Sequence, residues 1–101
     1  MKMYILVKDT LTPEHVALTC AHGSLSCWFS YDFDDDMVDW ALNSFRKCIC
    51  VLNEKEFENA KKFDKYVTMT ESSLNGQETA LVFCPREEWP KAFKFYKLYK
   101  G

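Results

Sequence analysis

Apolar residues fall in four short runs with the length and composition of β-strands. The first, Met3 to Val7, is unbroken and flanked by charge, which is typical of a strand covered on both faces. The second, Lys47 to Leu52, alternates cysteine with branched apolar residues, so both of its faces are apolar. Tyr66 to Thr70 and Thr79 to Cys84 form the other two, and Asn75-Gly76 between them is a strong turn signal. We therefore predict four strands, the last two antiparallel.

A helix is predicted between the first two strands, beginning just after Thr12. Thr12 can cap it, Pro13 fits the first helical position, and the pattern continues to about Trp28 or Phe29. Small side chains share one face, which we expect to lie against the sheet. These residues are Ala17, Cys20, Ala21 and Ser24.

Three further helices follow from their start signals. Asp34-Asp35-Asp36 would lie at the positive end of a second helix, so we interpret the carboxylates as a solvated cap rather than a metal site. Asn53 and Glu56 have capping-box spacing, which predicts a third helix through Phe63. A last helix is expected to begin at Pro85.

The order of these elements favours one α/β domain over residues 1–101. A right-handed crossover between parallel strands and an antiparallel last pair together predict a mixed four-stranded sheet with helices on both faces. A chain of 101 residues, 48% of them hydrophobic, can bury the core that this fold requires.

Five cysteines and the absence of a long apolar segment bear on location. The first apolar run ends at Lys8, too soon for a secretion signal or a membrane span, so we expect a cytoplasmic protein with reduced thiols. Cys48 and Cys50 lack metal-ligand spacing, and Cys20 and Cys27 have no CxxC partner. We therefore expect no metal, and we interpret all five cysteines as small buried apolar residues.

The net charge of −2 is unevenly distributed along the chain. Residues 1–45 carry two basic and seven acidic side chains, whereas residues 46–101 carry eleven basic and eight acidic. Near the C-terminus, lysines alternate with aromatic residues from Trp89 to Tyr99. This pattern fits either RNA binding by phosphate contact and base stacking, or a terminal helix whose rings pack into the core.

Several blocks of the sequence resemble the type II peptidyl-tRNA hydrolases. The blocks lie in the family's order and span nearly the whole chain. They are Lys2 to Asp9, Val16 to Gly23, Lys47 to Leu52, Gly76 with Thr79 to Pro85, and Pro85 to Lys100, the last being closer to the branch known only as peptidyl-tRNA hydrolase domain proteins.

The resemblance implies an enzyme that cleaves the ester between a peptide and the 3′ end of tRNA. It implies no metal or other cofactor, peptidyl-tRNA as partner, and a homodimer. The family's proposed catalytic residues are replaced, however. His15 stands at the position of the helix lysine, Thr19 at the glutamine, Val67 at the aspartate and Glu71 at the threonine of the loop.

His22, His15 and Glu71 are the candidate catalytic residues, and Lys8, Lys91 and Lys94 the candidate contacts to tRNA. His15 and His22 are seven apart, which places them on one side of a helix, and a neutral histidine can act as a base. Two alternatives stay open. His22 can be a buried structural residue and His15 an exposed substitution, and the chain can be a catalytically silent module that binds RNA or a protein through its C-terminal segment.

Overall fold

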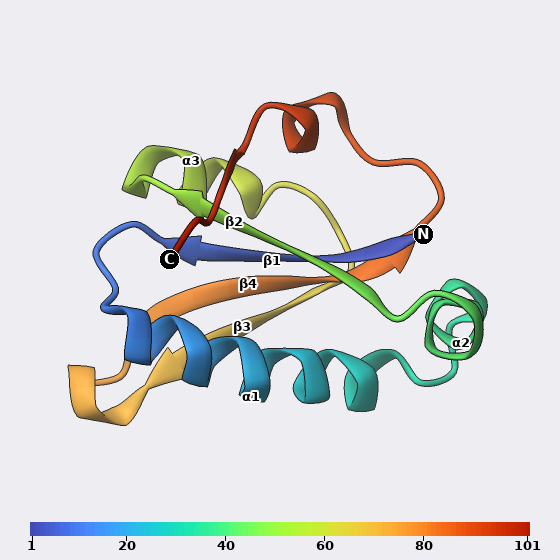
Figure 1. The fold of residues 1–101 in the computed structure, drawn as a ribbon, viewed down its shortest axis with the longest axis horizontal. Coiled ribbons are helices and arrows are strands. Elements are labelled where there is room, and N and C mark those ends of the chain that lie inside the picture. The colour runs from blue at the N-terminus through green and yellow to red at the C-terminus, as the bar shows by residue number, and fades with distance from the viewer.

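The computed structural model describes residues 1–101 and contains one mixed five-stranded sheet in the order β3-β4-β1-β2-β5 (Figure 1). The strands are β1 (Lys2–Lys8), β2 (Arg46–Leu52), β3 (Tyr66–Glu71), β4 (Gln77–Arg86) and β5 (Lys97–Leu98). β1 runs parallel to β2 and antiparallel to β4, and β3 pairs antiparallel with β4. The prediction of a mixed sheet is confirmed. The predicted number of four strands is wrong, because the short β5 adds a fifth.

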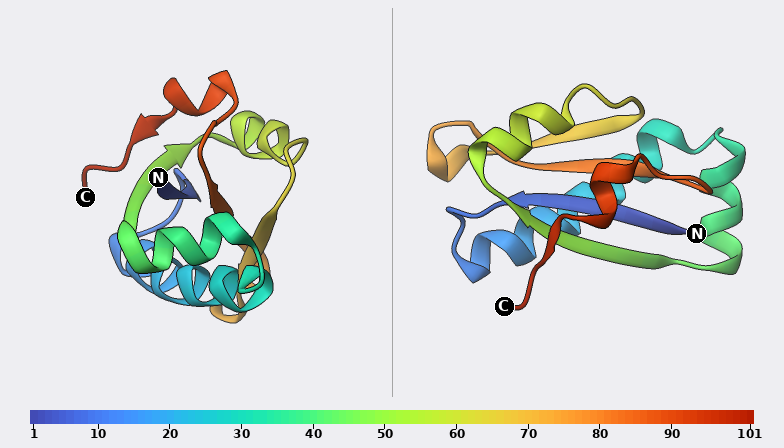
Figure 2. Two further views of the ribbon diagram at one scale, coloured as in Figure 1. Left: turned by 90° about the vertical axis from the view of Figure 1, so that its right-hand side faces the viewer. Right: turned by 90° about the horizontal axis from the view of Figure 1, so that it is seen from above.

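Helices cover both faces of the sheet, as predicted (Figure 2). α1 (Pro13–Tyr31) and α2 (Asp35–Asn43) lie on one face, and α3 (Glu54–Ala60) with the 3-10 helix η2 (Lys91–Lys94) lies on the other. The central strand supplies both cores, because Met3, Ile5 and Val7 point to the first while Tyr4 and Leu6 point to the second. Its unbroken apolar run is thus explained by burial on both sides.

α1 begins as its start signals indicate but presents a different face to the sheet. Thr12 caps the helix by accepting the backbone N–H of His15, and Pro13 occupies its first turn. The buried residues of α1 are Val16, Thr19, Gly23 and Cys27. The predicted small-residue face is wrong, since Ala17 and Ala21 are exposed.

α1 approaches the sheet closely at Gly23. A Cβ atom on this residue would lie 2.6 Å from Val82 Cγ2 and 3.2 Å from Met69 Cγ. One turn earlier, the buried Thr19 hydroxyl is 2.7 Å from that of Thr79, so a polar pair is satisfied inside the core. These contacts fix how α1 lies over β3 and β4.

The caps of the shorter helices are confirmed. The Asp34 side chain accepts the backbone N–H of Met37 at the start of α2. Asn53 and Glu56 form a complete capping box at the start of α3. That helix ends at Ala60, before the predicted Phe63, because the chain tightens into turns from Lys61 to Phe63.

The predicted C-terminal helix is wrong. Pro85 lies within β4, which continues to Arg86, and Pro90 is extended (φ −54°, ψ 147°), so only the four-residue η2 forms after it. Phe93 is buried against the rings of Tyr4, Phe83 and Trp89. The chain then adds β5 to the edge of β2, since ring packing and strand pairing replace the helix.

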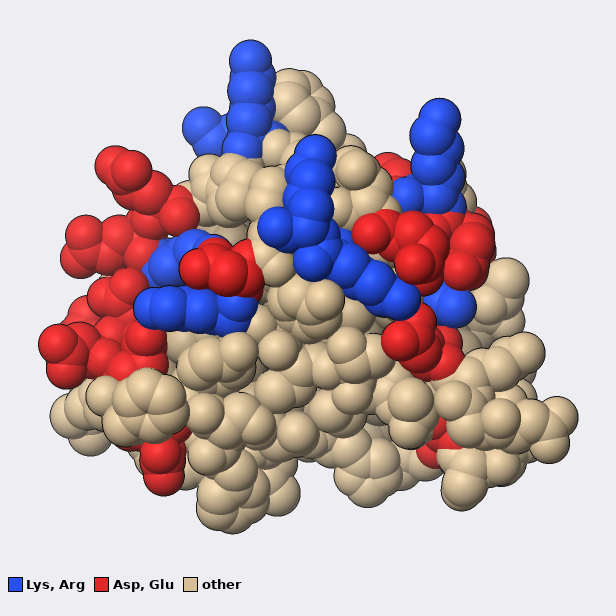
Figure 3. Space-filling view, turned by 180° about the vertical axis from the view of Figure 1, so that it is seen from behind, with Lys and Arg blue, Asp and Glu red and all other residues tan.

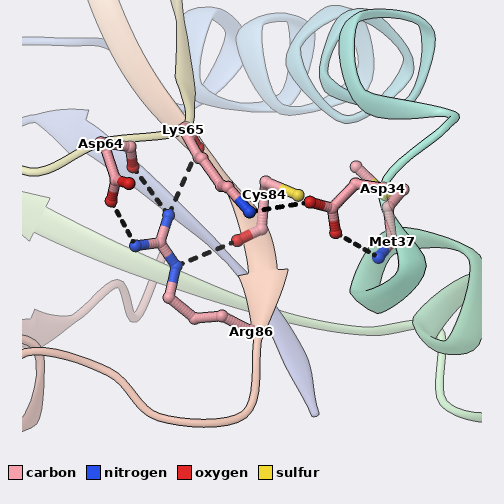
Figure 4. A network of polar contacts seen from close by, with 6 residues as sticks. All are labelled: Asp34, Met37, Asp64, Lys65, Cys84 and Arg86. Atoms are coloured by element: carbon pink, nitrogen blue, oxygen red, sulfur yellow. Dashed lines mark hydrogen bonds and ion pairs between the residues drawn. The ribbon is translucent and has the colours of Figure 1, made fainter.

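A polar network ties the end of β4 to the start of α2 (Figure 4). Lys65 Nζ lies 2.8 Å from Asp34 Oδ2, and the Arg86 guanidinium donates to the side chain and carbonyl of Asp64. Burial opposes ionisation of Asp34, but hydrogen bonds from Lys65 and from the Met37 backbone hold the pKa of its carboxyl below the ordinary value. The network lies at the end of the sheet opposite to the start of α1 (Figure 1).

Candidate functional site

The candidate site lies at the end of the sheet where β1 finishes and α1 begins (left side of Figure 1). His15 is in the first turn of α1, and β3 ends nearby at Glu71, followed by the 3-10 helix η1 (Ser72–Leu74). Asn75 closes that turn in the left-handed conformation (φ 57°), which asparagine tolerates better than most residues. The turn predicted from Asn75-Gly76 thus brings residues of β3 and η1 against α1.

His15 and Glu71 are brought together, through a serine that the sequence did not suggest. His15 Nε2 is 3.3 Å from Ser73 Oγ, and Ser73 Oγ donates to Glu71 Oε2 at 2.9 Å. On the other side of the ring, His15 Nδ1 is 3.0 Å from Thr12 Oγ1. The imidazole is therefore held at both nitrogens.

The hydrogen-bond directions follow from the number of protons available. The single Ser73 hydroxyl proton goes to the Glu71 carboxylate, so Ser73 Oγ must accept from His15 Nε2–H. Thr12 Oγ1 accepts the His15 backbone N–H and can donate its own proton to Nδ1. Neutral His15 thus carries its proton on Nε2 and its lone pair on Nδ1.

Glu71 is a carboxylate fixed by its surroundings. The backbone N–H of Ser73 and then its hydroxyl lower the pKa of the Glu71 carboxyl, and positive charge on His15 and His22 adds to the effect. The carboxylate is therefore ionised near neutral pH, one hydroxyl away from the His15 ring.

His22 lies two turns further along α1, roughly 10 Å from His15 along the helix axis. It is exposed and makes no side-chain hydrogen bond, while His15 is half-buried. The alternative in which His22 is a buried structural residue is therefore wrong, whereas His15 is partly exposed and hydrogen-bonded. His22 belongs to the same side of α1 but not to the bonded chain.

The candidate tRNA-binding lysines do not form one patch. Lys8 is beside the site but pairs with Glu54 at 3.2 Å and lies over the Phe57 ring. Lys91 and Lys94 are exposed on η2, across the sheet from His15. On the face seen in Figure 3, most charged side chains lie in the upper part, and few lie in the lower part.

An open cleft of about 530 Å³ adjoins the His15 chain. Leu11 and Leu74, the neighbours of Thr12 and Ser73, are part of its wall. Lys8 and Glu78 line it as well, the latter paired with Lys61 at 2.7 Å. His15, Ser73 and Glu71 do not line this cleft themselves.

No group of three or more His, Cys, Asp and Glu side chains is arranged to hold a metal ion. None of the helices combines the length and apolar character that crossing a membrane requires.

The sequence missed Thr12 and Ser73 as members of the site. Thr12 was assigned only as a helix cap, and Ser73 lies in a polar loop whose fold depends on the sheet. Neither carries a spacing signal for catalysis.

A comparison with models of protein families and a search of curated proteins both find no match to this chain.

Proposed function

We propose that this chain hydrolyses an ester bond with His15 as the base, and that the ester is that of peptidyl-tRNA. The observation that carries the proposal is the bonded chain from His15 through Ser73 to the Glu71 carboxylate. The substrate follows from the resemblance of the sequence blocks to type II peptidyl-tRNA hydrolases. The chemistry itself uses only groups of this chain and water.

His15 would act through Nδ1, the nitrogen that carries the lone pair. A water that replaces the Thr12 hydroxyl at this nitrogen gives up one proton to the ring as its oxygen attacks the ester carbonyl. The imidazolium then donates from Nε2 to Ser73, and Ser73 donates to Glu71, so the new positive charge faces a fixed carboxylate. Nδ1–H subsequently protonates the leaving ribose oxygen.

Binding of tRNA would involve Lys8 first, because it is the candidate lysine nearest to the site. Its ammonium is paired with Glu54, an exposed carboxylate that a phosphate can replace at small cost. Lys91 and Lys94, across the sheet, would contact only a nucleic acid that wraps around the molecule. Affinity for tRNA should therefore fall with salt by a slope that reflects few phosphate contacts.

The test is the release of peptide from purified peptidyl-tRNA by the chain and its variants. His15→Gln should lower kcat/KM by about 10² or more, the usual contribution of a general base. Ser73→Ala and Glu71→Gln should each lower it by about tenfold, the value of one charge-assisted hydrogen bond. His22→Ala is the matched histidine control and should change the rate less than His15→Gln.

The alternative of a silent binding module depends on the C-terminal segment, and the structure limits that surface. Trp89, Phe93 and Tyr96 pack on the sheet, so they are not free to stack on bases. Phe95 remains 75% exposed, next to Lys94. Peptide release no faster than the uncatalysed rate, together with salt-dependent tRNA binding lost in Phe95→Ala, would favour this alternative over hydrolysis.

A further inference from the structure

A second concave site lies at the far end of α1, between that helix, α2 and the start of β2. Its volume is about 340 Å³, and its walls include Leu25, Trp28, Trp40 and Phe45. Leu25 is ten residues beyond His15, or about 15 Å along the helix axis. The pocket is therefore separate from the candidate hydrolytic site, and it has the size and apolar lining of a small-molecule site.

Phe45 forms one wall in a conformation that is unfavourable for its residue type. It has φ 62°, in the left-handed region where a helix normally ends with glycine or asparagine, and its side chain is 62% exposed. The ring stacks on Trp40, with centroids 5.0 Å apart and planes 23° from parallel. An exposed aromatic ring held at a strained position is a feature associated with ligand sites.

Lys47 supplies the one cation at the pocket. Its Nζ lies 3.7 Å from the centre of the Phe45 ring and 5.1 Å from that of Trp40, and it donates to the Phe45 carbonyl at 3.1 Å. No carboxylate pairs with it, whereas Lys8 and Lys65 each pair with one carboxylate and Lys61 pairs with two. One N–H is used by the Phe45 carbonyl and another faces the Phe45 ring, so one of the three donors is available to a ligand.

The charge and shape of the pocket select one class of ligand. No acidic side chain lines it, so a carboxylate can reach Lys47 without repulsion from the wall. The two indoles and the Phe45 ring offer flat apolar surfaces to which an aromatic ring can stack. The hydrogen bond between an ammonium and a carboxylate is strengthened by both charges.

We propose that this pocket binds small aromatic monocarboxylates, with the ring between Leu25, Trp28 and Phe45 and the carboxylate on Lys47. The proposal is independent of ester hydrolysis at His15. A molecule bound here lies more than two helical turns from His15, and none of the pocket residues belongs to the hydrogen-bonded group of His15, Ser73 and Glu71.

The three tryptophans of the chain provide the assay. Trp28 and Trp40 line the pocket, whereas Trp89 packs on Tyr4 across the sheet, with ring centroids 4.6 Å apart. Titration of the ¹⁵N-labelled chain with 3-phenylpropionate should shift the indole N–H signals of Trp28 and Trp40 and leave that of Trp89 in place. Neutral 3-phenylpropionamide should bind about tenfold more weakly, and 3-phenylpropylamine more weakly still.

Two variants test the walls without relying on loss of folding. Lys47→Met keeps the aliphatic stem and should weaken binding of 3-phenylpropionate about tenfold. Phe45→Asn suits the left-handed backbone but removes the ring, so it should weaken binding while the fold is retained. Lys62→Met is the matched control, because Lys62 also lies over a ring, that of Phe63, at 5.2 Å.

The proposal is overturned if the amide binds as tightly as the carboxylate, or if Lys47→Met binds as well as the unchanged chain. Movement of the Trp89 signal alone, or no shift at all, would also overturn it. Each of these results leaves the test of peptide release unaffected.

Discussion

Replacing Gly23 by alanine tests how closely α1 is packed on the sheet. In a helix that faces solvent, this change stabilises by about 1 kcal/mol because alanine is the better helix former. Here the new Cβ would lie 2.6 Å from Val82 Cγ2, a side chain that is fully buried in the middle of β4. Overpacking of a core costs about 1–3 kcal/mol and is largest where the neighbour cannot move.

We expect Gly23→Ala to lower the free energy of unfolding by up to about 2 kcal/mol, because the overpacking cost exceeds the gain of about 1 kcal/mol in helix propensity. Urea denaturation followed by circular dichroism measures this, with an unchanged m-value showing that the transition remains comparable. Val82→Ala removes the clashing atom, so the double variant should be more stable than the sum of the two single effects by about 1 kcal/mol or more. A more stable Gly23→Ala variant, or strict additivity, would refute the close approach of α1.

Three further predictions concern the caps, the second core and the thiols. Asp34→Ala should lower the free energy of unfolding by about 1–2 kcal/mol, because it removes both the cap of α2 and the ion pair with Lys65. Asp34→Asn keeps the cap and should cost under about 1 kcal/mol. Because the pKa of Asp34 is lowered in the folded state, its carboxylate stabilises the fold above the ordinary aspartate pKa, and this stabilisation is lost as pH falls through the folded-state pKa. Urea titrations at several pH values should show that Asp34→Asn removes this part of the acid sensitivity. Phe93→Ala should lower the free energy of unfolding by about 3–5 kcal/mol in the same assay, because Phe93 is 2% exposed and lies among five other aromatic rings. A loss under about 1 kcal/mol would mean that η2 does not pack on the sheet. Burial raises the pKa of Cys27, Cys50 and Cys84 to about 12. Brief treatment with a thiol reagent followed by mass spectrometry should therefore find these three unmodified, while the half-buried Cys20 and Cys48 react first. Equal labelling of all five cysteines would contradict the burial of these three.

The sequence was most informative where local signals and burial agree. The run Met3 to Val7 became the central strand because both of its faces are covered, and Thr12, Asp34 and Asn53 cap helices as their chemistry requires. These elements depend on neighbours within a few residues, so they could be predicted.

Features that depend on long-range packing were not predicted. The buried face of α1 was misjudged because apolar residues such as Leu18, Leu25 and Phe29 also lie on its exposed side. Contact with Val82 distinguishes the buried Gly23 from the exposed Ala21. The C-terminal helix was expected from Pro85 onward, but the aromatic residues that follow gain more by packing on the sheet. The prediction that all five cysteines are buried is wrong for Cys20 and Cys48, which are half-buried, because composition alone does not show which side of an element is covered.

Two residues of the hydrogen-bonded group His15, Ser73 and Glu71 had been named from the sequence. His15 and Glu71 were named from their alignment with the family's catalytic positions, and the fold joins them through Ser73, 58 residues from His15 along the chain. No sequence pattern identifies such a residue, because its position depends on the turn after β3. Lys91 and Lys94 were selected from a charge pattern that ignored which face of the sheet the segment covers.

The most direct test of hydrolysis at His15 is the initial rate of peptide release from peptidyl-tRNA, compared between the unchanged chain and His15→Gln at equal concentration. The proposed mechanism predicts release well above the uncatalysed rate for the unchanged chain and a loss of about 10² or more in the variant, with both proteins folded by circular dichroism. Equal rates for the two proteins, or no release by either, would contradict it.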